Sequence, residues 1–377
     1  MPITLDGTNG ITTPMYNGSI TANAVTPSVN MKNRLINSAM VIDQRNAGAS
    51  FSSSVNGVYS LDRWYNQNNT SGTRFSVQQN AGNVTCPNGF SNYLGVTTAS
   101  AYTVGSTDVI GIGQYIEGYN IADLGWGTAN AKTVTLSFWV RSSLTGTFGG
   151  SLHEGGAATA FYPYTYTISA ANTWEYKTVT VVGPTIGTWQ TTNSRGLSVL
   201  FNLGTGATFS GAAGSWSASP NYAPTGVVSV VGTSSATFYI TGVQLEVGST
   251  ATSFDYRPYG TELALCQRYF QRTEQYAANT GSSVSFTNYI GLSVSAFNWL
   301  WHSISFPVTM RTSPTVTTSD FAGNTGKISV WNSSGGGYST NINPYTLYAI
   351  RDGFSYSDYN NAKFGVGISG YIASAEL

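Results

Sequence analysis

Apolar and polar positions alternate along most of the chain in short runs with a period of two. In residues 134–141 the even positions are Val, Leu, Phe and Val, while the odd positions are Thr, Ser, Trp and Arg. Such alternation predicts a half-buried strand, with one face on a core and the other toward solvent. Residues 174–182 and 197–201 show the same pattern. Clusters of Gly, Ser, Asn and Pro separate these runs, so we expect many strands joined by turns and folded as a two-sheet sandwich.

The alternation changes phase once inside a long apolar run, over residues 237–246. The apolar residues at 238 and 240 share one parity, and those at 243 and 245 share the other. The pattern therefore slips by one residue near Thr241 and Gly242. A β-bulge at this point would keep all four apolar side chains inward.

Two segments depart from the strand pattern. Residues 1–30 are rich in Thr, Asn, Gly and Pro and have no amphipathic period, which predicts an arm that is ordered by contact with a partner. Between residues 259 and 272, Leu263, Cys266 and Phe270 follow helical spacing, which predicts a short helix that passes into a strand near Arg268. We therefore expect an N-terminal arm, a sandwich domain, a linker with a short helix and a smaller β domain, at residues 1–30, 31–258, 259–272 and 273–377.

The composition favours an all-β fold. Only 8% of the residues are charged, while 43 are Gly and 24 are Tyr. Amphipathic helices would need Lys, Glu and Arg on their solvent faces, whereas Ser, Thr, Asn and Tyr favour strands and turns. The 16 basic residues equal the 16 acidic ones and form no cluster, so we expect no nucleic-acid partner. No apolar run approaches the roughly 18 residues of a membrane span, so we expect no membrane insertion.

The first residues have neither the basic segment nor the apolar segment of a secretory signal. A surface rich in hydroxyl and aromatic groups is nevertheless typical of extracellular proteins. A virion component, made in a host cytoplasm without a signal peptide and released by lysis, combines both properties. We therefore expect the protein in a virus particle.

Motifs for catalysis are missing from the sequence. His153 and His302 fall in different predicted domains, and neither adjoins a Ser or Cys nucleophile motif. The acidic residues are scattered, without the carboxylate pair of a glycosidase. No Cys or His residues show the spacing of metal ligands. We therefore predict that the protein is no enzyme, with no catalytic residue, no cofactor and no metal site.

Aromatic residues give a stronger signal. Exposed rings bordered by polar groups suit sugars, because the rings stack on C–H faces while hydroxyls need donors and acceptors. One candidate group lies on the polar face of residues 134–141, and another shares one face of residues 161–168, beside a predicted loop with His153 and Glu154. Burial of these rings in the core or in a subunit interface is the alternative, and the sequence favours it. The candidates for glycan binding are Trp139, Arg141, Tyr162, Tyr164 and Tyr166.

Four separated motifs, in this order, resemble those of bacteriophage tail-fibre and related virion proteins, especially of marine and cyanobacterial phages. They lie at residues 33–46, 61–64, 135–142 and 241–248, the last with 266–269. Residues 306–317 and 373–377 are similar to the C-terminal part of those proteins, and residues 4–10 to their attachment end. The resemblance implies a homotrimeric virion fibre protein involved in host attachment and bound to other virion proteins through residues 1–30. The candidate anchoring residues are Leu5, Asp6, Asn9 and Tyr16.

Residues 136–141 and 238–243 also resemble strands of jelly-roll carbohydrate-binding modules. This resemblance implies a jelly roll for residues 31–258 and a host-surface glycan as partner. Such modules often carry acidic residues before the last apolar pair of this strand to hold a structural Ca²⁺, whereas this chain has Thr241 and Gly242. Two other classes stay open: a capsid or tail decoration protein whose jelly roll only contacts its neighbours, and a depolymerase.

Overall fold

The computed structural model describes residues 4–6, 10–12, 32–156, 158–273, 300–320, 324–332, 338–342, 346–358, 363–368 and 370–377. The chain forms two compact units, Met1–Lys32 and Asn33–Leu377. In the first unit, β1 (Thr4–Asp6) and β2 (Gly10–Thr12) pair antiparallel, with Leu5 opposite Ile11. This division draws no boundary inside residues 33–377, so the predicted domain boundaries in this range stay a prediction.

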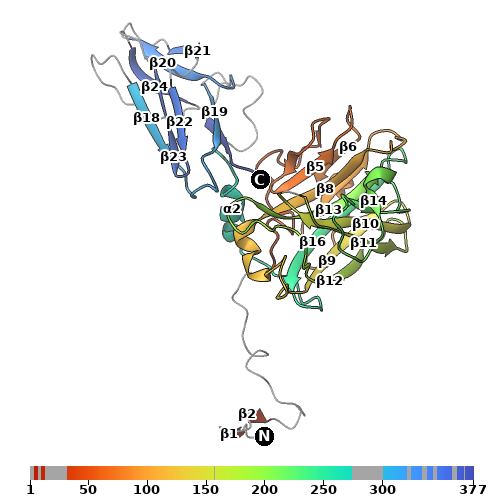
Figure 1. Cartoon of the computed structure of the whole chain (residues 1–377). Helices are drawn as coiled ribbons and strands as arrows, with labels where there is room; N and C mark the ends of the chain where they lie inside the picture. Colours follow the sequence, from red (N-terminus) through yellow and green to blue (C-terminus); the bar gives the residue numbers. More distant parts are fainter. Residues whose placement is uncertain are drawn as a thin grey trace. The chain divides into compact units, whose positions relative to one another are not determined.

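Two six-stranded sheets form the predicted jelly-roll sandwich (Figure 1). All neighbouring strands in both sheets are antiparallel. The first sheet has the order β11 (Phe161–Ile168), β10 (Gly146–Glu154), β13 (Arg195–Thr205), β8 (Val109–Glu117), β5 (Trp64–Asn68) and β4 (Val58–Leu61). The second has the order β12 (Glu175–Val181), β9 (Val134–Ser142), β16 (Thr237–Val247), β7 (Leu94–Thr98), β6 (Phe75–Gln79) and β3 (Phe51–Ser52).

Short elements connect the strands of the sandwich. β14 (Ser210–Gly211) and β15 (Ala223–Pro224) form a parallel pair. The single-turn 3₁₀ helices are η1 (Ala81–Asn83), η2 (Gly118–Asn120), η3 (Ala122–Leu124) and η4 (Ala207–Phe209).

The apolar positions of the alternating runs meet between the two sheets. Phe138 of β9 lies 5.0 Å from Phe201 of β13, measured between ring centroids, and both are fully buried. The opposite face of β9 is less exposed than the sequence predicted, because Thr135 is also buried. The chain after β16 returns across this face, where the carbonyl oxygen of Gly248 accepts a hydrogen bond from the Thr135 hydroxyl at 2.8 Å. Strand β9 is therefore covered on part of both faces.

The predicted β-bulge is present in β16. Pairing of β16 with β9 shifts register between Thr241 and Gln244. Val243 and Leu245 remain fully buried on the far side of the shift. Gly242 has φ +60°, and a Cβ at this position would lie 2.5 Å from the ring of Phe90. The bulge therefore needs glycine both for its backbone conformation and for the close approach of this ring.

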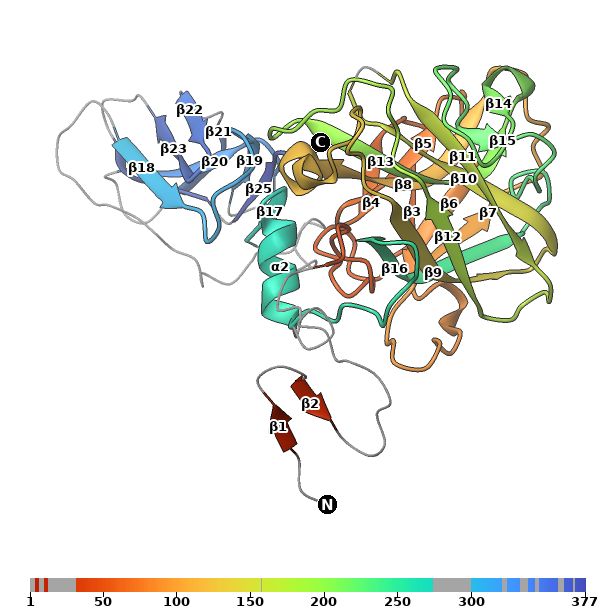
Figure 2. The ribbon, with the colours of Figure 1, turned by 60° about the horizontal axis from the view of Figure 1, so that its bottom comes forward.

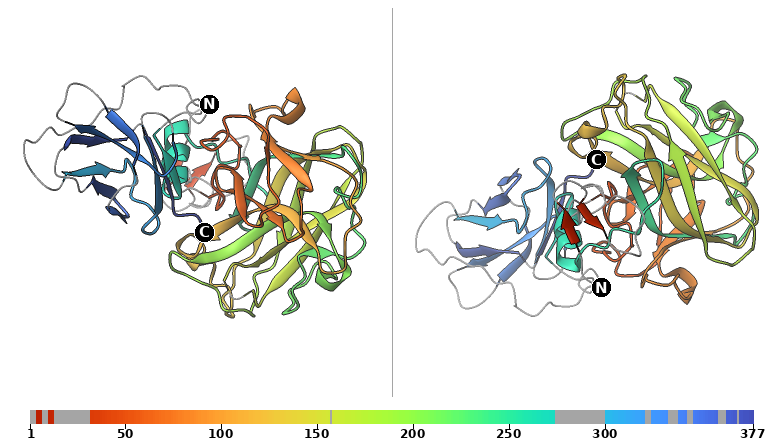
Figure 3. Two further views of the ribbon diagram at one scale, coloured as in Figure 1. Left: turned by 90° about the horizontal axis from the view of Figure 1, so that it is seen from above. Right: turned by 90° about the horizontal axis from the view of Figure 1, so that it is seen from below.

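The predicted helix and the strand after it are also confirmed. Helix α2 (Tyr259–Gln267) precedes β17 (Phe270–Arg272), beside which it lies in Figure 2. A smaller set of strands follows, which we call the small β unit, shown in blue and apart from the jelly-roll strands in Figure 3. Its three sheets have the orders β17–β25 (Gly370–Ser374)–β19 (Thr315–Ser319), β18 (Leu300–Ser305)–β23 (Gly353–Asp358)–β22 (Thr346–Ile350) and β21 (Tyr338–Ile342)–β20 (Ile328–Asn332)–β24 (Lys363–Gly367). Across the described ranges, none of the helices has the length and apolar character that a membrane span requires.

Buried charges tie the end of the small β unit to the jelly roll. The Glu376 carboxylate pairs with Arg63, whose side chain is only 1% exposed, and with Arg45 at 2.6 Å. The Arg63 guanidinium lies 3.6 Å from the centroid of the Tyr269 ring. Arg311 donates to the carbonyl oxygens of Asn193 at 2.6 Å and of Glu376 at 2.9 Å. Several of the chain's few charged side chains therefore converge on one junction.

Candidate functional site

The structure separates the candidate tyrosines from solvent. Tyr164 and Tyr166 are 1% and 6% exposed and belong to the core between the sheets. Burial raises the pKa of both phenols well above its usual value. Tyr162 is partly buried and packs on the ring of Trp216 at 5.3 Å. The three residues do share one face of β11, but this face is turned toward the core. Tyr164 and Tyr166 are therefore buried, which is the alternative that the sequence favoured, and they are not candidates for glycan binding.

His153 and Glu154 lie at the end of strand β10 rather than in a loop. His153 is 5% exposed, stacks on Phe161 at 5.2 Å and shares a hydrogen bond of 3.1 Å with the Ser151 hydroxyl. Burial lowers the pKa of His153 to about 3, so the imidazole is neutral at pH 7. This environment fits a structural histidine.

Trp139 and Arg141 lie on the outer face of the second sheet, as predicted, because their neighbours Phe138 and Val140 point into the core. Tyr176 of β12 stands directly opposite Trp139, and the two ring centroids are 5.4 Å apart. Trp139 is partly exposed and Tyr176 is 44% exposed. We call Trp139, Arg141 and Tyr176 the outer-face platform.

The indole N–H of Trp139 is the distinctive group of this platform. Within the described ranges it has no hydrogen-bond acceptor, and it is not among the buried polar atoms that lack a partner, so water reaches it. The indole N–H of every other tryptophan with a described side chain donates to a backbone carbonyl: Trp64, Trp126, Trp174, Trp189 and Trp216. A ring whose donor is left free on the surface is suited to a polar ligand.

Arg141 adds further donors to the platform. Its Nε–H donates to the carbonyl oxygen of Asn172 at 3.0 Å, and its guanidinium carbon lies 5.5 Å from the centroid of the Tyr239 ring. These two contacts fix the side chain. Its terminal Nη groups have no acceptor among the residues that the structure describes and are not buried. The platform therefore combines two aromatic rings with hydrogen-bond donors that point to solvent.

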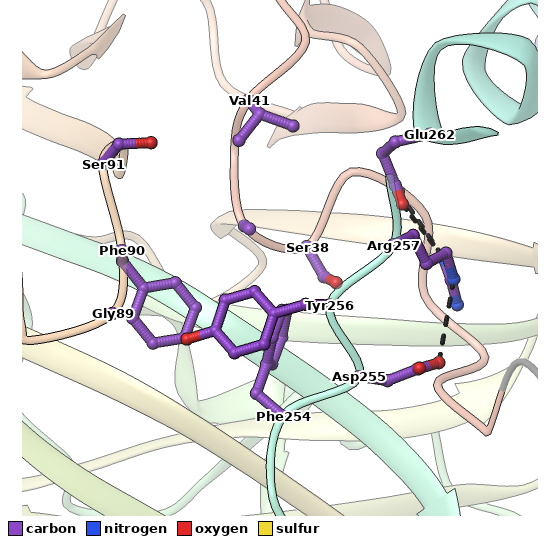
Figure 4. A pocket seen from close by; sticks show the side chains of 11 residues that line it. Ser38, Val41, Gly89, Phe90, Ser91, Phe254, Asp255, Tyr256, Arg257 and Glu262 are labelled. Atoms are coloured by element: carbon purple, nitrogen blue, oxygen red, sulfur yellow. Dashed lines mark hydrogen bonds and ion pairs between the residues drawn. The ribbon is translucent and has the colours of Figure 1, made fainter. Parts of the chain in front are cut away.

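A second candidate site, which sequence reasoning missed, is a cavity whose Phe90 ring lies against Gly242 at the bulge of β16. Figure 4 shows the rings of Phe90, Phe254 and Tyr256 together on one side of it and the charged groups of Asp255, Arg257 and Glu262 on the other. Its volume is about 130 Å³. We call it the aromatic pocket. Its lining residues are Ser38, Ala39, Val41, Gly89, Phe90, Ser91, Phe254, Asp255, Tyr256, Arg257 and Glu262.

The aromatic wall of the pocket is a tight cluster. The centroid of the Phe90 ring lies 5.0 Å from that of Phe254 and 5.5 Å from that of Tyr256. Tyr256 is 58% exposed. A Cβ on Gly89 would lie 2.7 Å from the Tyr256 hydroxyl, so a larger residue at this position would clash with the Tyr256 side chain.

Most polar groups of the charged wall already contact other residues of the protein. Arg257 Nη1 donates to the carbonyl oxygen of Leu35 at 3.0 Å and faces Glu262 at 3.4 Å. Asp255 Oδ2 accepts from the backbone N–H of Asn33 at 3.2 Å and pairs with Arg257 Nε at 3.8 Å. Asp255 Oδ1, by contrast, accepts no hydrogen bond from the described residues. This oxygen is the free acceptor of the pocket.

No periodic pattern could have found the pocket or Tyr176. The pocket residues come from three segments far apart in the sequence, at 38–41, 89–91 and 254–262. Tyr176 becomes important only because β12 pairs with β9. The one local sign is the alternation of aromatic and charged residues at 254–257, outside any strand.

The remaining predictions concern metals and the arm. In the described ranges no three side chains of His, Cys, Asp or Glu gather at one place, and the expected absence of a metal stays a prediction. Leu5 and Asp6 lie in β1, opposite Ile11 and Gly10. Asn9 and Tyr16 lie outside the described residues. The anchoring role of these four residues is untested.

Comparison with known proteins gives structural similarity alone. No protein-family model matches the chain, and no curated protein matches its sequence. A family 4 carbohydrate-binding module is 16% identical over 56% of this chain and 98% of its own, with a TM-score of 0.28. The family 11 carbohydrate-binding module from Clostridium thermocellum, in complex with a mixed-linked tetrasaccharide, is 12% identical over 54% and 98%, with a TM-score of 0.26. The enzymatically active domain of tailspike protein 4 of bacteriophage CBA120 is 13% identical over 55% of this chain and 22% of its own, with a TM-score of 0.30.

Proposed function

We propose that the protein is a non-enzymatic fibre component of a virus particle that attaches to its host by binding surface glycans on the outer-face platform. The observation that carries the glycan part is the free indole N–H of Trp139, held beside the exposed ring of Tyr176. Sugars offer C–H faces to such rings and hydroxyl oxygens to such donors. Arg141 supplies further donors two residues along the same strand face.

The order of the motifs that resemble tail-fibre proteins supports the virion part of the proposal. The separate N-terminal unit supports attachment through the arm, because a pair of three-residue strands needs further contacts to be stable. In this proposal other virion proteins supply those contacts. The protein is made in the host cytoplasm and functions in the particle, without a cofactor and without nucleic acid as a ligand.

The fibre is expected to be a homotrimer. Three copies would present three platforms to one surface, and linked sites raise avidity by roughly 10²–10⁴ over a single contact. Light scattering coupled to size-exclusion chromatography should give three times the 40.0 kDa mass of the chain. A monomer in solution and on the particle would contradict the trimer.

The substitution Trp139→Ala should weaken glycan binding at least tenfold without unfolding the protein. The ring lies outside the core, so its removal takes away a stacking surface and a donor and leaves no interior cavity. Retention on polysaccharide gels measures the effect, with agarose galactan, laminarin, alginate and bacterial lipopolysaccharide as the panel. Adsorption of particles to host cells is the second measurement.

Tyr119→Ala is the matched control, because this tyrosine is 61% exposed and lies away from the platform, in η2. Its binding should equal that of the unmodified protein. Equal retention of the Trp139→Ala protein would refute the platform. A large fall in its melting temperature would mean that the ring stabilises the fold rather than binding a ligand.

A further inference from the structure

We propose that the aromatic pocket is a second ligand site, which binds a single neutral sugar ring. The inference deepens the proposed function and takes its ligand class from it, but its residues are different. The platform lies on the outer face of β9 and β12, whereas the pocket is a cavity between the loops at 89–91 and 254–257, the segment at 38–41 and helix α2.

The size of the cavity limits the ligand to one ring. An apolar cavity of about 150 Å³ takes up benzene, while pockets for drug-sized molecules start near 300 Å³. The aromatic pocket, at about 130 Å³, has a volume close to that of the benzene-sized cavity. Because Tyr256 is 58% exposed, the pocket opens to solvent at this ring. A sugar ring can therefore enter with its substituents reaching water, whereas a chain of sugars cannot be enclosed.

The lining has the two kinds of group that a sugar requires. Phe90 and Tyr256 supply apolar ring surface for a C–H face. Asp255 Oδ1, without a donor among the described residues, supplies a charged acceptor for a hydroxyl, and such hydrogen bonds are roughly twice as strong as neutral ones. The rings and the carboxylate line the same cavity.

The charges of the pocket favour a neutral sugar over an acidic one. Two carboxylates, from Asp255 and Glu262, stand against the single guanidinium of Arg257. This guanidinium is already engaged with Glu262, with Oδ2 of Asp255 and with the backbone carbonyls of residues 33 and 35. It therefore cannot form a bidentate pair with the carboxylate of a uronic acid, which the free Asp255 oxygen would repel.

The pocket and the platform share one face of the second sheet. Thr241 of β16 stands opposite Trp139, and the next residue, Gly242, lies against the ring of Phe90. Paired strands bring opposite Cα atoms within about 5.5 Å of each other. The two sites are therefore neighbours across β16, and Thr241 between them is fully buried beneath the chain at Asn92.

Saturation-transfer NMR on the full chain tests the pocket directly. The probes are methyl α-glucopyranoside, methyl β-galactopyranoside, N-acetylglucosamine and sodium glucuronate. At least one neutral probe should bind saturably, and glucuronate should bind at least tenfold more weakly. Tyr256→Ala should weaken the neutral probe about tenfold, and Asp255→Asn should weaken it while keeping the shape of the pocket. Tyr259→Ala is the matched control, because this tyrosine is 62% exposed and does not line the pocket.

The outcomes separate the pocket from the platform. Failure of every neutral probe to bind, or equal binding by the Tyr256→Ala protein, overturns the pocket. Loss of probe binding in Trp139→Ala but not in Tyr256→Ala assigns the sugar to the platform and also overturns the pocket. A third outcome is that Tyr256→Ala weakens probe binding while Trp139→Ala leaves polysaccharide retention unchanged. This outcome supports the pocket and rejects the platform. Melting temperatures of all variants show whether each one is folded.

Discussion

Replacing Glu376 by alanine should lower the free energy of unfolding by about 3–5 kcal/mol, the usual cost of removing one partner from a buried ion pair. The Arg63 side chain is 1% exposed and that of Arg45 is 14% exposed, and both face the Glu376 carboxylate. Without it, the buried Arg63 guanidinium loses its ion-pair partner, and Arg45 keeps only the more distant attraction of Asp43 and Asp62. Denaturant unfolding of the full chain measures the loss.

Asp123→Ala is the control for this experiment. Asp123 pairs with Arg34 at 2.7 Å, but its side chain is 49% exposed, so the loss should be at most about 1 kcal/mol. The double variant Arg63→Met with Glu376→Ala should lose less than the sum of the two single variants, because the charge that Glu376 balances is also removed. Equal losses for Glu376→Ala and Asp123→Ala would refute a buried junction between the jelly roll and the small β unit.

Acid should destabilise the protein through His153. Burial lowers the pKa of this imidazole to about 3, whereas in the unfolded chain it is near 6.5. Between these values the unfolded state binds a proton that the folded state does not, so stability falls as the pH falls, by about 1.4 kcal/mol per pH unit. The contribution is fully present above pH 6.5. About 3 kcal/mol of it should be lost by pH 4.5.

The variant His153→Gln isolates this effect. The difference in unfolding free energy between the unmodified protein and the variant should shrink by about 3 kcal/mol from pH 7 to pH 4.5. Asp62→Asn serves as the opposite control. Burial raises the pKa of Asp62 to about 6, so the folded state binds its proton first and this group adds stability as the pH falls from about 6 to 4. A pH-independent difference for His153→Gln would contradict the buried neutral histidine.

The elements that depend on local pattern were predictable from the sequence. The alternation at residues 134–141 became β9, and the phase change near Gly242 became the bulge in β16. The helical spacing of Leu263 and Cys266, interrupted near Arg268, became α2 and β17. Each of these features depends on side chains that are only a few residues apart, so the local sequence is enough to predict it.

The candidate site was only partly predictable, because alternation does not say which face of a strand meets the core. Parity placed Trp139 on the outer face of β9, but for β11 it left open whether the tyrosine face was exposed or buried. This face lies against the other sheet, so Tyr164 is buried. The low charge of the chain pointed to a surface for neutral ligands. It did not predict that Arg45, Arg63 and Glu376 would meet in one buried junction.

By itself, the sequence determined an all-β chain with a bulged strand, a short helix at residue 259 and a surface poor in charge, since period and composition are local properties. Only the tertiary structure decided which aromatic rings are exposed to solvent. Pairing of β9 with β12 set Tyr176 beside Trp139, and the fold brought Phe90, Asp255 and Tyr256 around one cavity. These contacts join segments distant along the chain, and their free energy comes from burial and pairing that no short run of residues contains.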